Sequence, residues 1–373
     1  MTSRERLLAA LNRKKTDRVP ISTYELAGYN SRSFENNEPS YKKLMDYIRE
    51  KTDCVCMWDL NSNGVAAISS YPAKISSAVK RGANYNETRY TLKTPGGELT
   101  STSRVYDDLN TTWRTERWCK TTEDVDRYLS LPYEPESFDA SDHPRIIGEV
   151  GDRGIIMSSV SDPACHVMEL MEFGEATVWA MTETKHFERT MEEIHRRTMI
   201  NLGRMLTEKT VDLYRICGPE YLTPPYLPPE FFERFVAPYI REMTDLIHSH
   251  GGLVRIHSHG KIKNVLDGII ASGADALDPC EAPPDGDITL RELKERAGAR
   301  MCLFGNMQLK MLEHADAREI RETVRDCMDS AMGNGGYVIM PTAAPIDVSL
   351  SPKTEENYFA FIEAALEFGK YGD

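Results

Sequence analysis

The stretch Leu253-Val254-Arg255-Ile256-His257-Ser258-His259-Gly260 decides how the chain folds around it. An apolar, β-branched run stops at two histidines and a glycine, just after the pair Gly251-Gly252. Because side chains alternate between the faces of a strand, the pattern predicts that His257 and His259 point the same way at a strand's end. Two such imidazoles can bind a metal or move a proton. The alternative is a strand that simply ends in polar loop residues.

Buried strands alternate with helices along the rest of the chain. Strands are predicted at residues 19–22, 54–58, 154–157, 212–217, 253–256, 275–277, 301–304 and 336–340. Their lack of polar alternation predicts burial on both faces, as in a parallel sheet. This α/β pattern predicts a single (β/α)8 TIM barrel over residues 1–373. A doubly wound open sheet is the alternative, but no Gly-x-Gly-x-x-Gly follows any of the runs.

Residues 61–117 interrupt the rhythm and are rich in Thr, Ser, Asn and Gly. Alternating segments on both sides of Pro95-Gly96-Gly97 predict a β-hairpin inserted after the second strand. Helices are predicted at about 3–12, 40–50, 165–173, 175–182, 186–208, 229–250, 261–272, 289–297, 316–333 and 354–369, with a further helix starting at 121. Residues 132–144 are expected to form a loop.

The composition is that of a globular protein, with 40% hydrophobic and 28% charged residues. A net charge of −13 argues against a nucleic-acid or anionic-membrane surface. No run approaches the roughly 18 apolar residues of a membrane span, and the N-terminus lacks the apolar core of a signal peptide. The 8 cysteines form no Cys-x-x-Cys motif, so buried, reduced thiols and a cytoplasmic location are expected.

A barrel of this kind places its active site at the carboxyl ends of the strands. In chain order, those ends supply Tyr24, Glu25, Asp59, Glu220, His257, His259, Cys280, Glu281, Asn306 and Thr342. Two chemistries suit this set. In the first, His257 and His259 bind zinc, and Glu220 or Cys280 completes three protein ligands around an open position. In the second, no metal is present, and Asp59 and the histidines transfer protons.

Each candidate also has a structural alternative. Asp59 and Glu220 can cap a helix or a loop, and Thr342 can be a helix N-cap. Cys280 can be an inert buried thiol, the usual role of a lone cysteine. Asn306 follows a glycine and suits a turn.

Several motifs, taken in order, resemble the uroporphyrinogen decarboxylase superfamily. They are Arg4-Glu5-Arg6, Asp17-Arg18-Val19-Pro20, Arg255-Ile256-His257-Ser258-His259-Gly260, Gly286-Asp287-Ile288, Leu303-Phe304-Gly305-Asn306 and Glu356-Asn357. The resemblance covers nearly the whole chain and implies a (β/α)8 barrel. It also implies one of two activities, either decarboxylation of uroporphyrinogen III or zinc-dependent methyl transfer to or from corrinoid proteins.

The decarboxylase branch of this superfamily is matched poorly. That branch holds substrate carboxylates through two arginines of an Arg-Gln-Ala-Gly-Arg motif after the first strand. Residues 22–29 contain neither arginine, and Glu25 would repel an acidic porphyrinogen. The branch's essential aspartate corresponds to Asp59, whereas its C-terminal Gly-His-Gly is replaced by Thr342-Ala343-Ala344.

The methyltransferase branch is matched better. Its zinc ligands are typically His-x-Cys after the fifth strand and a further Cys after the eighth. Here the first pair reads His257-Ser258-His259, and the second position falls at Ala343 or Ala344, which cannot bind metal. The hairpin Thr94–Leu99 also resembles the corrinoid-linked members.

The resemblance therefore favours methyl transfer from a small methylated substrate to a separate corrinoid protein. The chain has no Asp-x-His-x-x-Gly motif, so the corrinoid would belong to a partner. The expected catalytic residues besides the metal ligands are Asp59, Glu25, Tyr24 and Asn306, and the expected substrate contacts are Trp58 and Thr342.

Two other functions stay open at this point. One is a cofactor-free decarboxylase, of the uroporphyrinogen type or acting on a smaller substrate through Asp59 and the histidines. The other is a catalytically silent barrel kept as a binding subunit. The resemblance also implies a homodimer.

Overall fold

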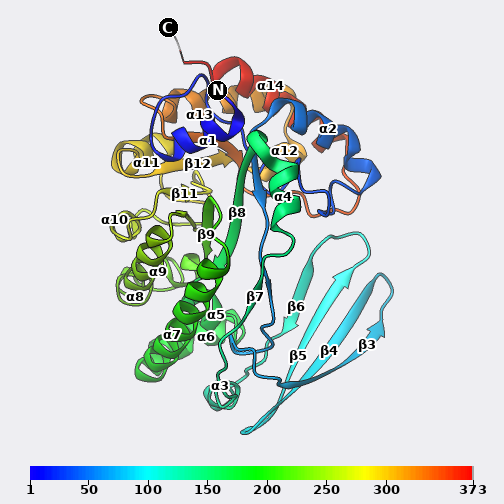
Figure 1. Cartoon of the computed structure of the whole chain (residues 1–373), viewed down its shortest axis with the longest axis vertical. Coiled ribbons are helices and arrows are strands. Elements are labelled where there is room, and N and C mark those ends of the chain that lie inside the picture. The colour runs from blue at the N-terminus through cyan, green and yellow to red at the C-terminus, as the bar shows by residue number, and fades with distance from the viewer. Residues whose placement is uncertain (372–373) are drawn as a thin grey trace.

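A curled parallel sheet forms the core of the chain (Figure 1). The computed structural model describes residues 1–371. Within them the sheet has the strand order β1-β8-β9-β10-β11-β12-β13, and all neighbours are parallel. The strands are β1 (Cys54–Met57), β8 (Gly154–Ser161), β9 (Leu213–Cys217), β10 (Leu253–His257), β11 (Ala276–Asp278), β12 (Cys302–Met307) and β13 (Tyr337–Pro341).

The predicted first strand closes the sheet into a barrel. Ser22 N donates to the Ile339 carbonyl at 3.0 Å, and Ile339 N donates to the Pro20 carbonyl at 3.0 Å. On the other edge, Asp53 N donates to the Ile21 carbonyl at 2.8 Å. The Asp53 carboxylate accepts the Ile21 N–H at 2.9 Å. Residues 20–22 therefore lie between β13 and β1, which confirms the predicted (β/α)8 barrel.

Helices surround the sheet, and most of them follow a strand in the chain. Their bounds are α2 (Lys42–Lys51), α4 (His143–Val150), α5 (Pro163–Met168), α6 (Phe173–Thr182), α7 (Thr184–Glu208), α8 (Pro229–Phe235), α9 (Ala237–Ser249), α10 (Leu266–Ala271), α11 (Leu290–Ala297), α12 (Leu309–His314), α13 (Ala317–Ala331) and α14 (Pro352–Phe368). Short 3-10 turns are η1 (Pro39–Tyr41), η2 (Gly151–Arg153) and η3 (Pro219–Leu222).

Two apolar clusters follow from the alternation of side chains along the strands. The barrel interior contains every second residue, for example Val55 in β1 and Phe304 in β12. Helix α1 (Ser3–Leu11) packs Leu7 and Leu11 into this interior cluster. The side chains of opposite parity, such as Cys56 in β1, pack outward against the helices. Polar residues of interior parity near the carboxyl ends of the strands are therefore the ones placed at the barrel mouth.

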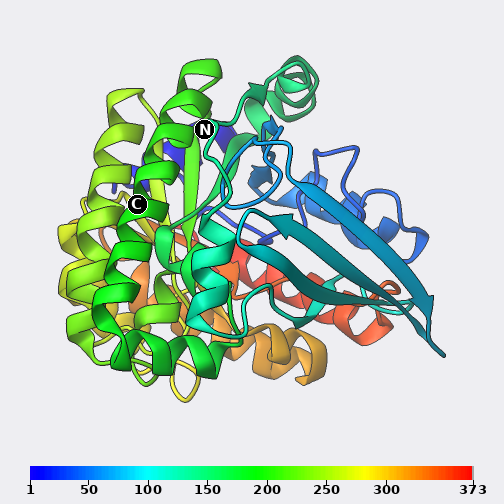
Figure 2. The same cartoon turned by 90° about the horizontal axis from the view of Figure 1, so that it is seen from below.

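The insertion after β1 is larger than the predicted hairpin. Among the described residues it forms an antiparallel sheet in the order β3-β4-β5-β6 that projects from the barrel on the side away from α1 (Figures 1 and 2). The bounds are β3 (Lys74–Arg81), β4 (Tyr85–Thr94), β5 (Gly97–Tyr106) and β6 (Thr112–Glu116), with β2 (Asn61–Ser62), β7 (Phe138–Asp139) and α3 (Thr122–Leu129) beside them. Strands β4 and β5 are the predicted hairpin. Asn110 N donates to the Ile346 carbonyl at 2.6 Å, which ties the sheet to the loop after β13.

The helix predictions fail at three places. The helix predicted over 229–250 is broken into α8 and α9 at Val236, because Pro238 has no N–H for a continuous helix. Helix α4 begins at His143, inside the predicted loop 132–144, with Pro144 in its first turn, where proline is tolerated. Helix α12 is too short to show a helical period. All 8 cysteines are free, as expected. No helix in residues 1–371 combines the length and apolarity needed to cross a membrane.

Candidate active site at the carboxyl end of the barrel

Three neighbouring strands bring charged side chains together at the barrel mouth. Arg215 of β9 stands beside Arg255 of β10, and His257 of β10 stands beside Asp278 of β11. All four have the parity of the barrel interior. The parallel register therefore places a layer with Arg215 and Arg255 below a layer with His257 and Asp278.

Asp278 is the centre of this group and is fully buried. One carboxylate oxygen lies 2.9 Å from His257 Nδ1, and the other lies 3.0 Å from Arg255 Nε. Burial would raise the pKa of Asp278, but the charges of Arg255, His257 and Arg215 outweigh burial and hold this pKa at about 2. Asp278 is therefore ionised, and it orients the His257 ring by accepting from Nδ1.

His259 also has its Nδ1 against a carboxylate, two residues further along the chain from His257. Its Nδ1 lies 3.0 Å from Glu281, which also accepts the Gly260 N–H at 2.7 Å. Burial lowers the pKa of His259, but the hydrogen bond and charge of Glu281 more than offset this, so the pKa lies above its ordinary value. The rings of His257 and His259 are 4.6 Å apart, as their spacing predicted. Within residues 1–371, neither Nε2 has a hydrogen-bond partner.

Tyr24 and Glu25 contact the arginine layer from the first barrel segment. Arg215 donates to the Tyr24 hydroxyl at 3.0 Å and lies 3.4 Å from a Glu25 carboxylate oxygen. Burial raises the pKa of Tyr24 above its usual range despite the nearby Arg215 charge. The Tyr24 ring also lies 6.2 Å from that of His257. Tyr24 therefore lies beside His257 and stays protonated, whereas Glu25 contacts Arg215 of the arginine layer.

The predicted zinc ligands do not form one group. The Cys280 thiol is buried and donates to the Leu277 carbonyl at 3.5 Å, and burial raises its pKa well above the usual range. Nowhere in the described part of the chain do three or more His, Cys, Asp or Glu side chains converge to hold a metal ion. The predicted ligand set therefore stays a prediction. Its two histidines meet, but the side chains present do not fit a zinc site with three protein ligands.

Glu220 lies near the histidines in a different role. It belongs to η3, directly after β9, and one of its carboxylate oxygens is buried without a partner in the described residues. Its charge contributes to the raised pKa of His259. It also adds to the effect of burial on Asp162, whose pKa lies well above the ordinary value. Asp162 is fully buried and caps α5 through a 2.7 Å bond to Cys165 N.

Asp59 is exposed at the end of β1. Its carboxylate accepts from the Ser158 hydroxyl and from Ser159 N, both at 2.7 Å. These bonds hold the end of β1 to β8, and they do not include either histidine. Its catalytic role stays a prediction.

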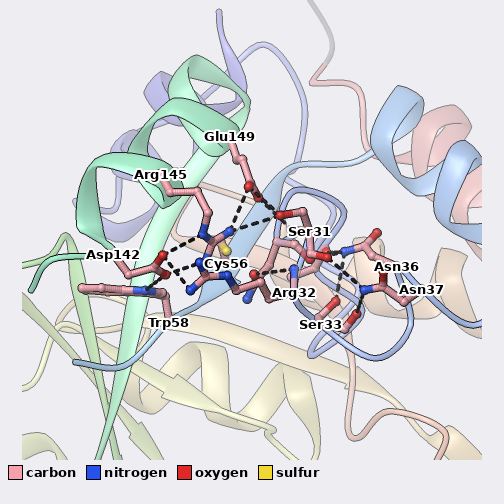
Figure 3. Close-up of polar contacts among 12 residues, drawn as sticks. Ser31, Arg32, Ser33, Asn36, Asn37, Cys56, Trp58, Asp142, Arg145 and Glu149 are labelled. Carbon is pink, nitrogen blue, oxygen red and sulfur yellow. Dashed lines mark hydrogen bonds and ion pairs between the residues drawn. The ribbon is translucent and has the colours of Figure 1, made fainter. Parts of the chain in front are cut away.

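Trp58 faces the outside of the barrel instead of the mouth. It has the outward parity of Cys56, and its indole Nε1 donates to Asp142 at 3.1 Å (Figure 3). Asp142 also binds Arg145, and Arg32 lies 2.8 Å from its carboxylate. The assignment of Trp58 to substrate binding stays a prediction. Its indole packs between the sheet and α4.

The Asn306 and Thr342 side chains form hydrogen bonds within the fold, away from the histidines' contacts. Asn306 donates to the Cys280 carbonyl at 2.8 Å and accepts from the Cys327 thiol of α13 at 3.3 Å. The Thr342 hydroxyl accepts the Leu309 N–H at 3.2 Å, which caps α12. Both side chains are buried. The structure therefore supports the structural alternative for each of them and does not bring them to the histidines.

The sequence interpretation missed Arg215, Arg255 and Asp278. Each is a charged residue at an interior parity of an otherwise apolar strand, and this pattern is the signal that could have identified them. Charged side chains are almost never fully buried unless they are paired. Counting charges inside predicted strands, as well as after them, would have found all three.

A family model described as "Uroporphyrinogen decarboxylase (URO-D)" matches residues 135–368. A solved structure described as a methyltransferase from Methanosarcina mazei has a TM-score of 0.62 at 15% identity and covers 99% of this chain and 99% of that chain. This likeness shows a shared fold over nearly the whole length.

Two further solved structures have lower scores. One, of a pneumococcal virulence factor studied for N-glycan recognition and hydrolysis, has a TM-score of 0.43 at 10% identity, covering 95% of this chain and 84% of that chain. The other, of a Bacillus subtilis mannanase, has a TM-score of 0.39 at 11% identity, covering 95% of this chain and 87% of that chain. Comparison with curated proteins by sequence gave no match.

Proposed function

The chain belongs to the uroporphyrinogen decarboxylase family, and within it we propose a methyltransferase that moves a methyl group from a small methylated substrate to a separate corrinoid protein. The main support for this proposal is the pair His257 and His259. In each ring a carboxylate contacts Nδ1, and Nε2 has no hydrogen-bond partner in the described residues. A shared fold with a protein described as a methyltransferase from Methanosarcina mazei also supports the choice.

The histidines suit the proton step of a demethylation. When a methyl group leaves an oxygen, nitrogen or sulfur atom, that atom keeps the bonding electron pair and must take a proton. His259 suits this role because its pKa lies above the ordinary value, through its contact with Glu281, so its acid form persists to higher pH. His257, oriented by the ionised Asp278, would position the substrate atom. The partner's corrinoid would supply the nucleophile that accepts the methyl group.

Zinc is left out of this proposal. The further cysteine that relatives use falls at Ala343 or Ala344, which cannot bind metal, and the Cys280 thiol donates to the Leu277 carbonyl. Proton transfer by the two imidazoles therefore carries the mechanism on this chain's side.

Decarboxylation is the main rival reaction. It is disfavoured for a porphyrinogen because no arginine occurs in residues 22–29 and Glu25 adds a negative charge there. A silent binding barrel is disfavoured by the two ordered imidazoles at the mouth, since a binding subunit has no need of them.

The test measures methyl transfer directly. Purified protein is mixed with reduced cobalamin and a panel of methylated ethers, amines and thioethers, and methylcobalamin formation is followed by absorbance. His259→Gln is expected to lower the rate by about 10²-fold or more, the usual size of a general acid's contribution. His314→Gln, at an exposed histidine of α12, is the matched control and keeps the rate. Release of CO₂ without methylcobalamin would establish decarboxylation instead.

A further inference from the structure

The buried layer beneath the histidines has more positive than negative charge. Arg215 and Arg255 are adjacent in register, and both are at least nine-tenths buried, at 9% and 1% exposure. The buried carboxylate that faces them is Asp278, which already contacts Arg255 Nε at 3.0 Å and His257 at 2.9 Å. Within residues 1–371, the buried Asp278 carboxylate thus contacts one guanidinium and one imidazole, and its charge also acts on Arg215.

Arg215 is the group left short of a partner. Its contacts are the neutral Tyr24 hydroxyl at 3.0 Å and Glu25 at 3.4 Å. The Glu25 side chain is 42% exposed, so water screens its charge. In the described residues the buried Nε of Arg215 has no hydrogen-bond partner. A buried charge whose nearest carboxylate is solvent-exposed and 3.4 Å away is only partly compensated, and an arriving anion would relieve the remaining cost.

The neighbouring groups are also suited to an anion. Tyr24 keeps its hydroxyl proton and can donate it. A guanidinium matches the planar, two-oxygen geometry of a carboxylate better than any other side chain.

We propose that Arg215 is the anchor for a carboxylate on the substrate, so that the molecule taken by the barrel is a small carboxylic acid. This inference rests on the proposed function and names its substrate class, a methylated acid whose carboxylate sits on Arg215 while its methyl-bearing atom faces the histidines. The Glu25 carboxylate then competes with the substrate, and the bound carboxylate displaces it from its 3.4 Å contact with Arg215.

Binding of simple acids tests the anchor without any turnover. The probes are acetate and benzoate, and the matched neutral probes are acetamide and benzamide. Binding is measured by calorimetry and by the shift in thermal unfolding midpoint, at constant ionic strength set with chloride. The acids are expected to bind and to raise the midpoint, and the amides are not.

Three variants locate the binding. Arg215→Gln is expected to weaken acid binding by about tenfold or more, the size of a charge-assisted hydrogen bond. Glu25→Gln should strengthen it, since the competing carboxylate is gone. Arg318→Gln, at an exposed arginine of α13, should leave it unchanged. If Arg215→Gln does not fold, Arg215→Lys replaces it, and weaker acid binding is again expected.

Three results would overturn the proposal. The first is equal binding of acids and amides, the second is unchanged acid binding in a folded Arg215 variant, and the third is no binding of either acid at millimolar concentration. None of these depends on methyl transfer. Acid binding through Arg215 without methylcobalamin formation would sink the proposed reaction and leave the anchor standing, whereas methyl transfer from uncharged substrates alone would do the reverse.

Discussion

At the ends of β9, β10 and β11, charged side chains contact one another, whereas at the ends of β12 and β13 polar side chains bond to the backbone. Arg255, His257 and Asp278 form one connected group with free imidazole nitrogen at the mouth. Asn306 donates to the Cys280 carbonyl, and the Thr342 hydroxyl accepts from the Leu309 N–H. The sequence predicted site residues on both sides for the same reason, that they follow buried strands. What separates them is whether a side chain's polar atoms remain available after folding.

The largest expected effect comes from the centre of the charged side. Asp278→Asn leaves Arg255 buried without its carboxylate, so the free energy of unfolding should fall by about 3–5 kcal/mol. Urea denaturation at neutral pH measures this. Asp285→Asn, in the exposed ion pair with Lys310, is the control and should cost about 1 kcal/mol or less. Equal losses in the two variants would contradict the comparison.

The same residue predicts an acid-sensitive stability. The folded-state pKa of Asp278 is about 2, below the value of about 3.9 for an unpaired Asp in an unfolded chain. Its contribution is therefore complete above the unfolded pKa and is lost as the pH falls toward 2. Denaturation at several acidic pH values should show this loss in the wild type. It should be reduced in Asp278→Asn, and an identical pH dependence in both proteins would exclude the assigned role.

A smaller effect concerns the outer histidine. Glu281→Gln removes the contact that raises the pKa of His259, so this pKa should fall. The acid form would then be lost earlier, and the alkaline limb of the rate profile should move to lower pH. Glu313→Gln, on α12, should leave the profile in place. A profile that does not move in Glu281→Gln would show that His259 is not the acid.

The smallest expected effect on function lies on the other side of the mouth. Asn306→Ala and Thr342→Ala should each lower the free energy of unfolding by about 1–3 kcal/mol, through unpaired buried partners, with acid binding unchanged. Thr342→Ser keeps the hydroxyl and should restore most of the loss. Loss of acid binding in a stably folded Asn306→Ala protein would show that β12 also contributes to the site.

The barrel and the histidine pair could be predicted because both depend on local periodicity. Alternation along residues 253–259 places His257 and His259 on one side whatever the rest of the chain does. The fate of Asn306 could not be predicted in this way. Gly305 has a φ of +145°, and a Cβ there would lie 2.1 Å from the Pro279 carbonyl. Strict alternation stops at this glycine, and the Asn306 side chain bonds to α13.

The layer formed by Arg215 and Arg255 was not predicted, for a different reason. Whether Arg215 and Arg255 can be buried depends on Asp278, which comes from another strand and is paired with them only in the folded barrel. Sequence order does not show how close Asp278 lies to the two arginines in the folded barrel. Sequence order is equally silent on the direction of a side chain after a strand, and the Cys280 thiol donates to the Leu277 carbonyl.

The closing segment 20–22 has a consequence for biosynthesis. Its partner Ile339 lies in β13, more than three hundred residues later in the chain. While the polypeptide emerges from the ribosome, the edge of residues 20–22 that faces β13 stays unpaired until that last strand is made. Exposed edges of this kind invite pairing with other chains, and the contacts between Asp53 and Ile21 are the ones that can hold this segment before β13 exists.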